Sequence, residues 1–461
     1  MAERRPKVLF LSRSIAHFSY YDSVIAGLLD RGAEVVLALD EEWSRNWSGG
    51  KDQAIREFME KHPQLVTSWS VRRSDKHREA IFALRELRSY RSYLLRTDTT
   101  PFYVERWRNY LSPELRKKSE DPKFIRWLKS PWADLYLRYR EWRTPPDRGI
   151  LEYLAAAAPS VLVLSPANMR FSEETDYLKA AKALGIRTAL PILSWDNLST
   201  KGLIQILPEK VFAWNEYQAQ DARRFHHVPP SRLEVTGSPF FDKWFDNQAE
   251  LPTRAEFCRA RSLDPRRKIL LYLGSSKNIA PDESWFVEEI RSALSASGDP
   301  NLRTCQILVR PHPANANIYK RLAGEGLRVF PEGGALPETR ADFADMRASF
   351  MHADAAIGIN TSGMIDSVLA GVPTFTVALD RYAATQADSK HYRYLLSRNA
   401  LYLEPSVEAF LVRLGEVFQG RDPNEADRRA FAERFARPRG LERPAGDVVA
   451  ESVLKLAKVA S

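Results

Sequence analysis

One pattern of strand, turn, helix and strand constrains the fold of this chain more than any other. An apolar run over residues 355–359 ends in Asn360-Thr361-Ser362-Gly363, a helical pattern covers 364–370, and a second apolar run covers 374–379. This order of elements is the repeating unit of an α/β sheet. The first turn of the helix would offer N–H groups and the positive end of a dipole, which suits a phosphate group. The same residues also suit an ordinary helix cap, so the pattern alone leaves both roles open.

Two other apolar runs in the same half of the chain end in polar loops. Arg310-Pro311-His312-Pro313 follows residues 305–309, and Gly274-Ser275-Ser276-Lys277 follows 268–273. Arginine suits bidentate contact with a phosphate, and histidine can donate to another oxygen. Because open α/β sheets bind ligands at the carboxyl ends of their strands, the sequence predicts one site there for an anionic ligand. The plainer alternative is that the loops are ordinary surface turns. The predicted donor-binding residues are Gly274, Ser275, Ser276, Arg310, His312, Asn360, Thr361, Ser362 and Gly363.

Length and composition indicate a globular protein of two domains. A chain of 461 residues is too long to fold around one hydrophobic core of ordinary size. Its content of 44% apolar and 28% charged residues is ordinary for a globular protein. Cys258 and Cys305 lie far apart, which argues against a disulfide framework and against a structural zinc site. The first apolar run is too short for a signal peptide, and no run reaches the roughly 18 apolar residues of a membrane span. We therefore expect a cytoplasmic protein, either free or peripheral on the inner face of the membrane.

The order of predicted elements indicates two doubly wound, Rossmann-like α/β domains. The first domain, 1–245, begins with strand, helix and strand, and Ser19 is the expected N-cap of that helix. The second domain, 266–435, carries the three polar loops, and 436–461 form a helical tail. No G-x-G-x-x-G follows the first strand, which argues against a tightly bound dinucleotide in the first domain.

Residues 72–148 interrupt this pattern and carry the charge excess of the chain. They hold 20 Lys and Arg against 11 Asp and Glu, a difference equal to the net charge of +9, and 13 of the 50 aromatic residues. Helical spacing over 74–96 and 123–142, with prolines as breaks, predicts a helical insertion in the first domain. We expect it to contact an anionic acceptor or an anionic membrane surface, against the alternative of a solvated basic face. No nucleic-acid-binding module is recognisable, so we expect no nucleic acid partner.

The motifs together resemble those of glycosyltransferases with the GT-B fold, and this resemblance implies that the two domains face a cleft. They are Arg310-Pro311-His312-Pro313, Asn360-Thr361-Ser362-Gly363 with Gly371-Val372-Pro373, and Thr236-Gly237-Ser238-Pro239. The first two are also similar to motifs of CDP-glycerol glycerophosphotransferases. A closer likeness, to a poorly characterised group of bacterial GT-B proteins, lies in Ser194-Trp195-Asp196-Asn197-Leu198-Ser199-Thr200-Lys201-Gly202 and Trp214-Asn215-Glu216.

The resemblance implies a metal-independent glycosyltransferase of bacterial surface polysaccharide or glycolipid assembly. Its donor would be a nucleotide sugar, its acceptor a saccharide or a lipid-linked saccharide, and no metal or other cofactor is expected. Non-hydrolysing nucleotide-sugar epimerases share the architecture and are the alternative enzyme class. A glycerophosphotransferase using CDP-glycerol and a non-catalytic binding protein are further alternatives.

Inverting transfer needs a base for the acceptor hydroxyl. His17 follows the first strand at the edge where ligands bind, and the ordinary pKa of histidine, about 6.5, suits a base; packing in the first turn is its plainer role. Asp196 is the rival catalytic residue, or binds hydroxyls if configuration is retained. Trp195 is a candidate to stack on a sugar ring, or a core aromatic, and Asn197 is a candidate to contact the acceptor.

The remaining histidines fit no catalytic group in the sequence. His226 and His227 precede two prolines and are expected at a solvated helix end.

Overall fold

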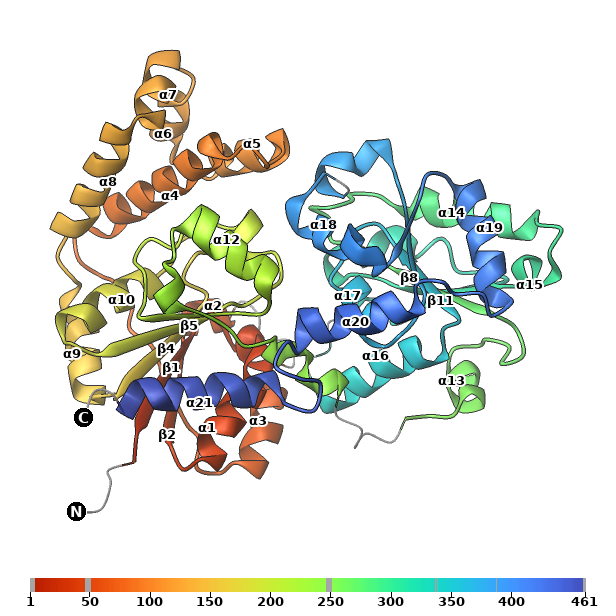
Figure 1. Ribbon diagram of the computed structural model, residues 1–461, viewed down its shortest axis with the longest axis horizontal. Helices are drawn as coiled ribbons and strands as arrows, with labels where there is room; N and C mark the ends of the chain where they lie inside the picture. The colour runs from red at the N-terminus through yellow and green to blue at the C-terminus, as the bar shows by residue number, and fades with distance from the viewer. Residues whose placement is uncertain are drawn as a thin grey trace. The chain divides into compact units, whose positions relative to one another are not determined.

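The computed structural model describes residues 5–45, 51–245, 251–335, 337, 339–386 and 388–458 (Figure 1). The chain divides into two compact units: unit 1 comprises residues 1–242 and 435–461, and unit 2 comprises 243–434. Residues 246–250, which lie between the two predicted domain ranges, are outside the described residues. None of the described helices is long and apolar enough to cross a membrane.

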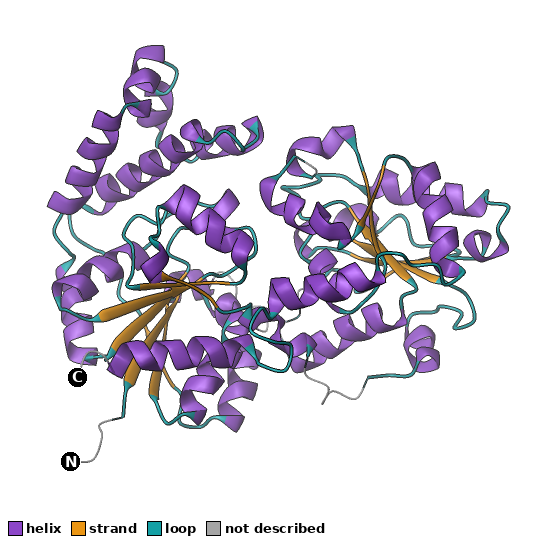
Figure 2. Cartoon of the chain, viewed as in Figure 1, coloured by secondary structure: helices purple, strands orange, loops and turns teal. Residues whose placement is uncertain are grey.

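Unit 1 is built on sheet A, whose seven strands run parallel in the order β3-β2-β1-β4-β5-β6-β7 (Figure 2). The central strands β1 and β4 are apolar and almost wholly buried, because helices cover both faces of a parallel sheet. The strands are β1 Lys7–Ser12, β2 Glu34–Leu39, β3 Val66–Trp69, β4 Val161–Ser165, β5 Arg187–Pro191, β6 Lys210–Ala213 and β7 Leu233–Val235.

The helices of unit 1 include the last helix of the chain, α21, which packs along α1 (Figure 1). The two axes approach closely because Gly27 lacks a side chain: a Cβ there would lie 3.1 Å from Cβ of Ala450. The helices outside residues 78–143 are α1 Asp22–Asp30, α2 Glu41–Arg45, α3 Lys51–Lys61, α9 Arg148–Ala157, α10 Glu174–Ala183, α11 Asn197–Thr200, α12 Glu216–His226 and α21 Ala445–Lys458, with 3-10 helices η1 Ile15–Tyr20 and η2 Pro230–Arg232; η3 Pro239–Trp244 reaches the boundary with unit 2.

The predicted start of the first helix is wrong. α1 begins at Asp22, and residues 15–20 form the separate 3-10 helix η1. Ser14 caps η1, because its side chain accepts a hydrogen bond from the N–H of Ala16, and the N-cap residue of α1 is Tyr21, whose side chain makes no capping hydrogen bond. Ser19 lies within η1 and therefore does not begin α1.

Between β3 and β4 the chain forms five helices with a small core of their own. They are α4 Arg78–Leu95, α5 Pro101–Asn109, α6 Pro113–Lys118, α7 Pro122–Lys129 and α8 Pro131–Arg143. Proline is tolerated at a first helical position, where its missing N–H has no partner to lose, so the prolines taken as breaks are helix starts. The helical stretch predicted over 123–142 is therefore two helices that meet at Ser130. The core consists of Leu87, Tyr90, Tyr93, Tyr103, Trp107, Leu111, Leu128 and Leu137. That this segment is an insertion relative to other proteins stays a prediction.

Unit 2 is built on sheet B, whose six strands run parallel in the order β10-β9-β8-β11-β12-β13. The strands are β8 Ile269–Leu273, β9 Gln306–Arg310, β10 Leu327–Val329, β11 Ala355–Gly358, β12 Thr374–Val377 and β13 Tyr402–Glu404. The sequence predicted the four inner strands. It missed the outer strands β3, β10 and β13 because these short segments mix polar with apolar residues and form no continuous apolar run.

The helices of unit 2 cover both faces of sheet B (Figure 2). They are α13 Arg254–Ala260, α14 Ser284–Ser295, α15 Pro300–Arg303, α16 Arg340–His352, α17 Gly363–Leu369, α18 Lys390–Leu396 and α19 Val407–Phe418, with 3-10 helices η4 Pro313–Tyr319, η5 Asp380–Thr385 and η6 Ser397–Asn399; α20 Glu425–Ala436 ends at the return to unit 1.

Both sheets reverse their strand order beside their first strand. The reversal lies between β1 and β4 in sheet A and between β8 and β11 in sheet B. Such a reversal opens a crevice outside the carboxyl ends of the strands, where open α/β sheets bind ligands. The predicted doubly wound α/β fold is confirmed in both units.

Candidate functional site

The three polar loops predicted in the second half meet at the carboxyl edge of sheet B. The N–H of Gly274, after β8, donates to the carbonyl of Arg310, at the end of β9, over 2.9 Å. The N–H of Asn360, after β11, donates to Oγ of Ser275 over 3.4 Å. Since β9, β8 and β11 are adjacent, the residues form one group at the reversal of the sheet.

Gly274 is required by the closeness of the neighbouring loop. A Cβ at this position would lie 3.0 Å from the N of His312, 3.1 Å from Cα of Pro311 and 2.9 Å from Oη of Tyr319. Two of these contacts are with backbone, which cannot rotate away. The glycine therefore lets the loops after β8 and β9 pack against each other.

Ser275 anchors the group from below. It is fully buried, and its N–H donates to the carboxylate of Glu283. The same carboxylate accepts from the hydroxyls of Tyr272, at 2.9 Å, and Tyr319, at 2.6 Å. Burial raises the pKa of Glu283 above its ordinary value, although these three donors oppose the shift. Ser275 thus holds the loops, while the partly exposed Ser276 stays a candidate ligand contact.

His312 presents a defined tautomer. Its Nδ1 accepts a hydrogen bond from the N–H of Ala314 over 3.1 Å and so caps η4. Burial lowers the pKa of His312, which favours the neutral ring. A neutral ring with an accepting Nδ1 carries its proton on Nε2. His312 therefore has an N–H donor of fixed identity at the site.

Arg310 is turned toward α16. Its Nη1 lies 2.9 Å from Oδ2 of Asp345 and 2.8 Å from Oγ of Ser349. Asp345 also pairs with Arg261. The guanidinium predicted to contact a phosphate is thus held at Nη1 by Asp345, a carboxylate that it shares with Arg261.

The N–H groups predicted to be free at the start of α17 are largely used within the turn. The N–H of Met364 donates to the carbonyl of Thr361 over 3.1 Å, and the N–H of Ile365 to the carbonyl of Ser362 over 2.9 Å. The N–H of Gly363 faces Oγ1 of Thr361 at 3.4 Å. The helix spans only seven residues, so its dipole is small. Few N–H groups at this helix end are therefore left for a ligand, and the most accessible hydroxyl of the loop is that of Ser362, which is exposed and caps no N–H.

Two other side chains of this region have structural partners. The amide of Asn360 donates to the carbonyl of Thr385 over 2.6 Å and is buried. Asp366, on α17, accepts from Nε1 of Trp244 over 2.8 Å. Burial raises the pKa of Asp366 to about 7, with the Trp244 hydrogen bond opposing.

In unit 1, the loop after β5 forms a hydrogen-bonded turn around Asp196 and Asn197. Asp196 accepts from Oγ of Ser194 at 2.6 Å and Oγ1 of Thr200 at 2.7 Å, and pairs with Lys201 at 3.2 Å. Asn197 is 1% exposed, and its side chain pairs with that of Asn168 at 2.5 Å. These contacts favour positioning roles for both residues over the predicted base and acceptor contact.

His226 lies beneath this loop, which corrects the prediction of a solvated histidine. It is 2% exposed. Its Nδ1 accepts from the N–H of Ile204 at 3.1 Å, and its Nε2 donates to the carbonyl of Leu198 at 2.8 Å. Burial lowers the pKa of His226 to about 3. A single neutral imidazole thus fixes both sides of the loop.

The other predicted residues of unit 1 lie apart from these contacts. Trp195 is 8% exposed, as expected of a core aromatic. His17 lies in η1 after β1, half-buried, with its ring perpendicular to that of Tyr20 at 6.3 Å. It stays a candidate base at the carboxyl edge of sheet A.

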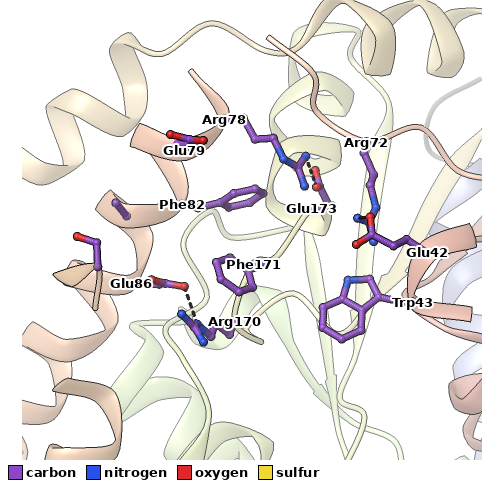
Figure 3. A pocket seen from close by; sticks show the side chains of 12 residues that line it. Glu42, Trp43, Arg72, Arg78, Glu79, Phe82, Glu86, Arg170, Phe171 and Glu173 are labelled. Carbon is purple, nitrogen blue, oxygen red and sulfur yellow. Dashed lines mark hydrogen bonds and ion pairs between the residues drawn. The ribbon is translucent and has the colours of Figure 1, made fainter. Parts of the chain in front are cut away.

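The sequence did not predict a pocket of about 460 Å³ at the carboxyl edge of sheet A (Figure 3). Its walls come from α2, from α4 and from the loops after β3 and β4. This volume falls within the range of small-molecule sites. The lining residues are Glu42, Trp43, Arg72, Arg78, Glu79, Phe82, Ala83, Glu86, Ser112, Arg170, Phe171 and Glu173.

Three aromatic rings form the apolar walls of the pocket. Phe82 and Phe171 meet edge to face at 5.9 Å. Phe171 is 40% exposed and has φ of 53°, a left-handed conformation that is strained for a bulky residue. Arg13 holds this turn through the carbonyl of Phe171 at 2.9 Å, and its guanidinium lies 4.5 Å from the ring of Trp43. The strained turn places the Phe171 ring in the pocket.

Ion pairs form the polar walls. Arg170 lies 3.1 Å from Glu86, and Arg78 lies 2.5 Å from Glu173, as Figure 3 shows. Arg72 pairs with Asp40 at 2.6 Å and with Glu42. Each lining guanidinium therefore already has a carboxylate partner.

Burial raises the pKa of two carboxylates of the pocket. Burial raises the pKa of Glu173 to about 7, against the opposing hydrogen bond from the N–H of Arg73 and the charge of Arg78. Burial also raises the pKa of Glu86. A carboxylate with a pKa near neutrality in a pocket is a candidate general base.

Comparison with solved structures identifies the architecture. A glycosyltransferase from Rickettsia africae ESF-5 matches with a TM-score of 0.54 and 11% identity over 99% of both chains. The UDP-GlcNAc 2-epimerase from Methanocaldococcus jannaschii matches with a TM-score of 0.54 and 13% identity over 97% of this chain and 99% of its own. The chain has the GT-B fold.

A third match, the S. aureus MnaA–UDP co-structure, has a TM-score of 0.55 and 8% identity over 98% of this chain and 96% of its own. Such low identities establish the fold and leave the reaction open. No protein-family model and no curated protein matches the sequence. The similarity to CDP-glycerol glycerophosphotransferases stays a prediction.

Proposed function

We propose that this protein is a glycosyltransferase that takes a nucleotide sugar on unit 2 and transfers its sugar to a saccharide. The observation that carries the proposal is the meeting of the loops after β8, β9 and β11 at the reversal of sheet B. Nucleotides bind at such reversals in doubly wound sheets. M. jannaschii UDP-GlcNAc 2-epimerase, a protein of similar fold, has been solved with UDP-GlcNAc and UDP.

The leaving nucleoside phosphate gains negative charge during transfer, and fixed donors would stabilise it. Nε2–H of His312 and the hydroxyl of Ser362 are the donors of this site with the clearest geometry. Removing one such donor from an oxyanion site typically costs about 2.7–4 kcal/mol of transition-state stabilisation. Arg310, at the end of β9, would add a positive charge beside them.

The pocket of unit 1 suits a neutral saccharide as the acceptor. Its aromatic walls match the apolar face of a sugar ring, and its paired arginines and carboxylates can donate to and accept from hydroxyl groups. Each lining arginine already pairs with a carboxylate, which disfavours an anionic ligand there. Within this proposal Glu173 accepts the proton of the attacking hydroxyl; His17 is the second candidate.

A nucleotide-sugar 2-epimerase is the second candidate function, and the matches to UDP-GlcNAc 2-epimerases favour it as much as the fold favours a transferase. One experiment distinguishes the two reactions. The protein is incubated with a panel of nucleotide sugars, with and without neutral oligosaccharides, and products are followed by mass spectrometry and NMR. Transfer to an added saccharide supports the proposal. Conversion of the sugar to its 2-epimer without any acceptor would replace it.

A further inference from the structure

Exposed aromatic side chains are concentrated on two short helices of unit 1. Of the fourteen large apolar residues that are exposed among those the structure describes, six lie on α7 and α8. Trp132 is 75% exposed and Trp142 is 73% exposed, the largest values of the set. Isolated exposed apolar residues are ordinary, whereas a cluster marks a surface that binds something. The six residues, called here the aromatic face, are Trp127, Trp132, Leu135, Tyr136, Tyr139 and Trp142.

The aromatic face is the unpacked side of α8. Ala133, Leu137 and Glu141 point into the unit and are buried. Residues 132, 135, 136, 139 and 142 recur at the spacing of one helical side, which is opposite to the buried one. α8 therefore packs against the unit with one side and exposes large apolar residues on the other.

Ring contacts hold the aromatic face together. Trp127 of α7 meets Tyr136 of α8 at 6.2 Å, and Tyr139 meets Trp142 at 6.0 Å. The helices rest on the separate core of α4–α8, and α6, α7 and α8 project away from sheet A in Figure 1. The face is therefore a prearranged surface on a firm support.

Basic residues surround the aromatic face. α7 and α8 carry Lys123, Arg126, Lys129, Arg138, Arg140 and Arg143, and all six are exposed. Their two acidic residues are already paired: Asp134 with Arg91 and Arg138, and the buried Glu141 with Arg85 and Lys179. The surface thus has a net positive charge next to indole and phenol rings.

We propose that the α7–α8 face docks on an anionic lipid bilayer, with its Trp and Tyr rings at the headgroup level and its Lys and Arg side chains on lipid phosphates. Tryptophan and tyrosine favour the interface between membrane and water, where one end of the ring is apolar and the other is hydrated. Basic residues beside them add attraction to anionic lipids. The basic residues around the aromatic face favour an anionic bilayer over an apolar protein partner, because an apolar partner would have no phosphates for them to bind.

The proposal goes beyond the catalytic proposal and stands independently of it, because binding to lipid is measured without substrate. The full chain is sedimented with vesicles of phosphatidylcholine alone and of phosphatidylcholine mixed with phosphatidylglycerol. Binding to the mixed vesicles, weakened by added salt, is expected. The double variant W132S/W142S is expected to bind the mixed vesicles about tenfold or more weakly than the wild type.

Two further variants keep the test decisive. K123E/K129E changes only exposed charges and is expected to weaken binding to mixed vesicles by about tenfold or more. W69S removes an exposed tryptophan (54% exposed) outside the face and is expected to bind like the wild type. Three results would overturn the proposal: no binding to mixed vesicles, equal binding to both kinds of vesicle, or a dimer in sedimentation velocity that W132S/W142S dissociates while lipid binding is unchanged.

Discussion

The N–H of Asn360 donates to Oγ of Ser275 across 3.4 Å, and this contact joins the loops after β11 and β8 at the reversal of sheet B. Both residues are buried, so the contact supports the site without being available to a ligand. Ser362, two residues further along, is exposed and makes no capping contact. Ser275 therefore supports the loops, whereas Ser362 stays a candidate ligand contact.

Replacing Ser275 and Ser362 by alanine is expected to give opposite results. S275A leaves a buried N–H without its acceptor, and such a loss costs about 1–3 kcal/mol of unfolding free energy, here at the lower end because the bond is long. S362A should leave stability unchanged and weaken nucleotide binding. Urea unfolding and calorimetry measure the two effects. Equal stability loss in both variants would contradict this division.

Gly274→Ala is expected to disrupt the donor site. The added Cβ would stand 3.0 Å from the N of His312, so the loop after β9 must move. We expect loss of nucleotide binding together with a lower melting temperature. Gly298→Ala is the matched control, because a Cβ there meets nothing within 4 Å. A Gly274→Ala variant that binds nucleotide like the wild type would show that the two loops need not touch.

Glu173→Gln tests the pocket through pH. The pKa of Glu173 is raised from 4.5 to about 7, so its favourable contribution to stability is present below pH 4.5 and lost as pH rises through 7. The stability of the glutamine variant does not depend on pH through this residue. Its free energy of unfolding should therefore rise by about 3 kcal/mol relative to that of the wild type when the pH is raised from below 4.5 to above 7. Denaturant titrations at several pH values measure this. A difference that is constant with pH would exclude the raised pKa.

The same variant tests catalysis. If Glu173 is the base, kcat/KM of the wild type rises with pH to a plateau above about 7. In the glutamine variant kcat should fall by about a hundredfold or more, and KM should change less. H17A is the comparison: a larger loss there than in Glu173→Gln would transfer the role of base to His17.

His226→Gln is expected to remove an acid sensitivity of unit 1. The pKa of His226 falls from 6.5 to about 3 on folding. Its contribution to the stability of the fold is therefore fully present above pH 6.5 and is lost as the pH falls toward 3. Glutamine can accept from Ile204 and donate to Leu198 without titrating. Between about pH 7.5 and 5 the wild type should lose about 2 kcal/mol more stability than the variant. Parallel stability curves for the two proteins would show that His226 is not neutral in the folded state.

The sequence predicted the strand ends of sheet B because each strand, loop and helix is contiguous in the chain. Buried runs and the glycine and serine residues after them identify the loops after β8, β9 and β11. The direction of a long side chain was beyond this reasoning. Arg310 pairs with Asp345, a residue on α16, and nothing in the local pattern distinguishes that partner from a phosphate.

The pocket of unit 1 was missed for a related reason. Phe82 and Phe171 belong to segments far apart in the chain, and the left-handed backbone of Phe171 has no sequence signal of its own. The one available clue was the polar loop after the apolar run that became β4, since a strand beside the reversal of a sheet is a place to expect ligands. His226 was misjudged because two following prolines suggested a helix end at the surface.

The most direct test of the account is calorimetric titration of the protein with UDP, GDP, ADP, CDP, CMP and TDP, repeated with His312→Ala and with His227→Asn. His227 is an exposed histidine with a left-handed backbone that asparagine tolerates, so it serves as the control. We predict that one nucleotide binds selectively, that His312→Ala weakens this binding by about tenfold or more, and that His227→Asn leaves it unchanged. Binding of no nucleotide, or equal binding by the wild type and His312→Ala, would contradict a nucleotide site at the carboxyl edge of sheet B.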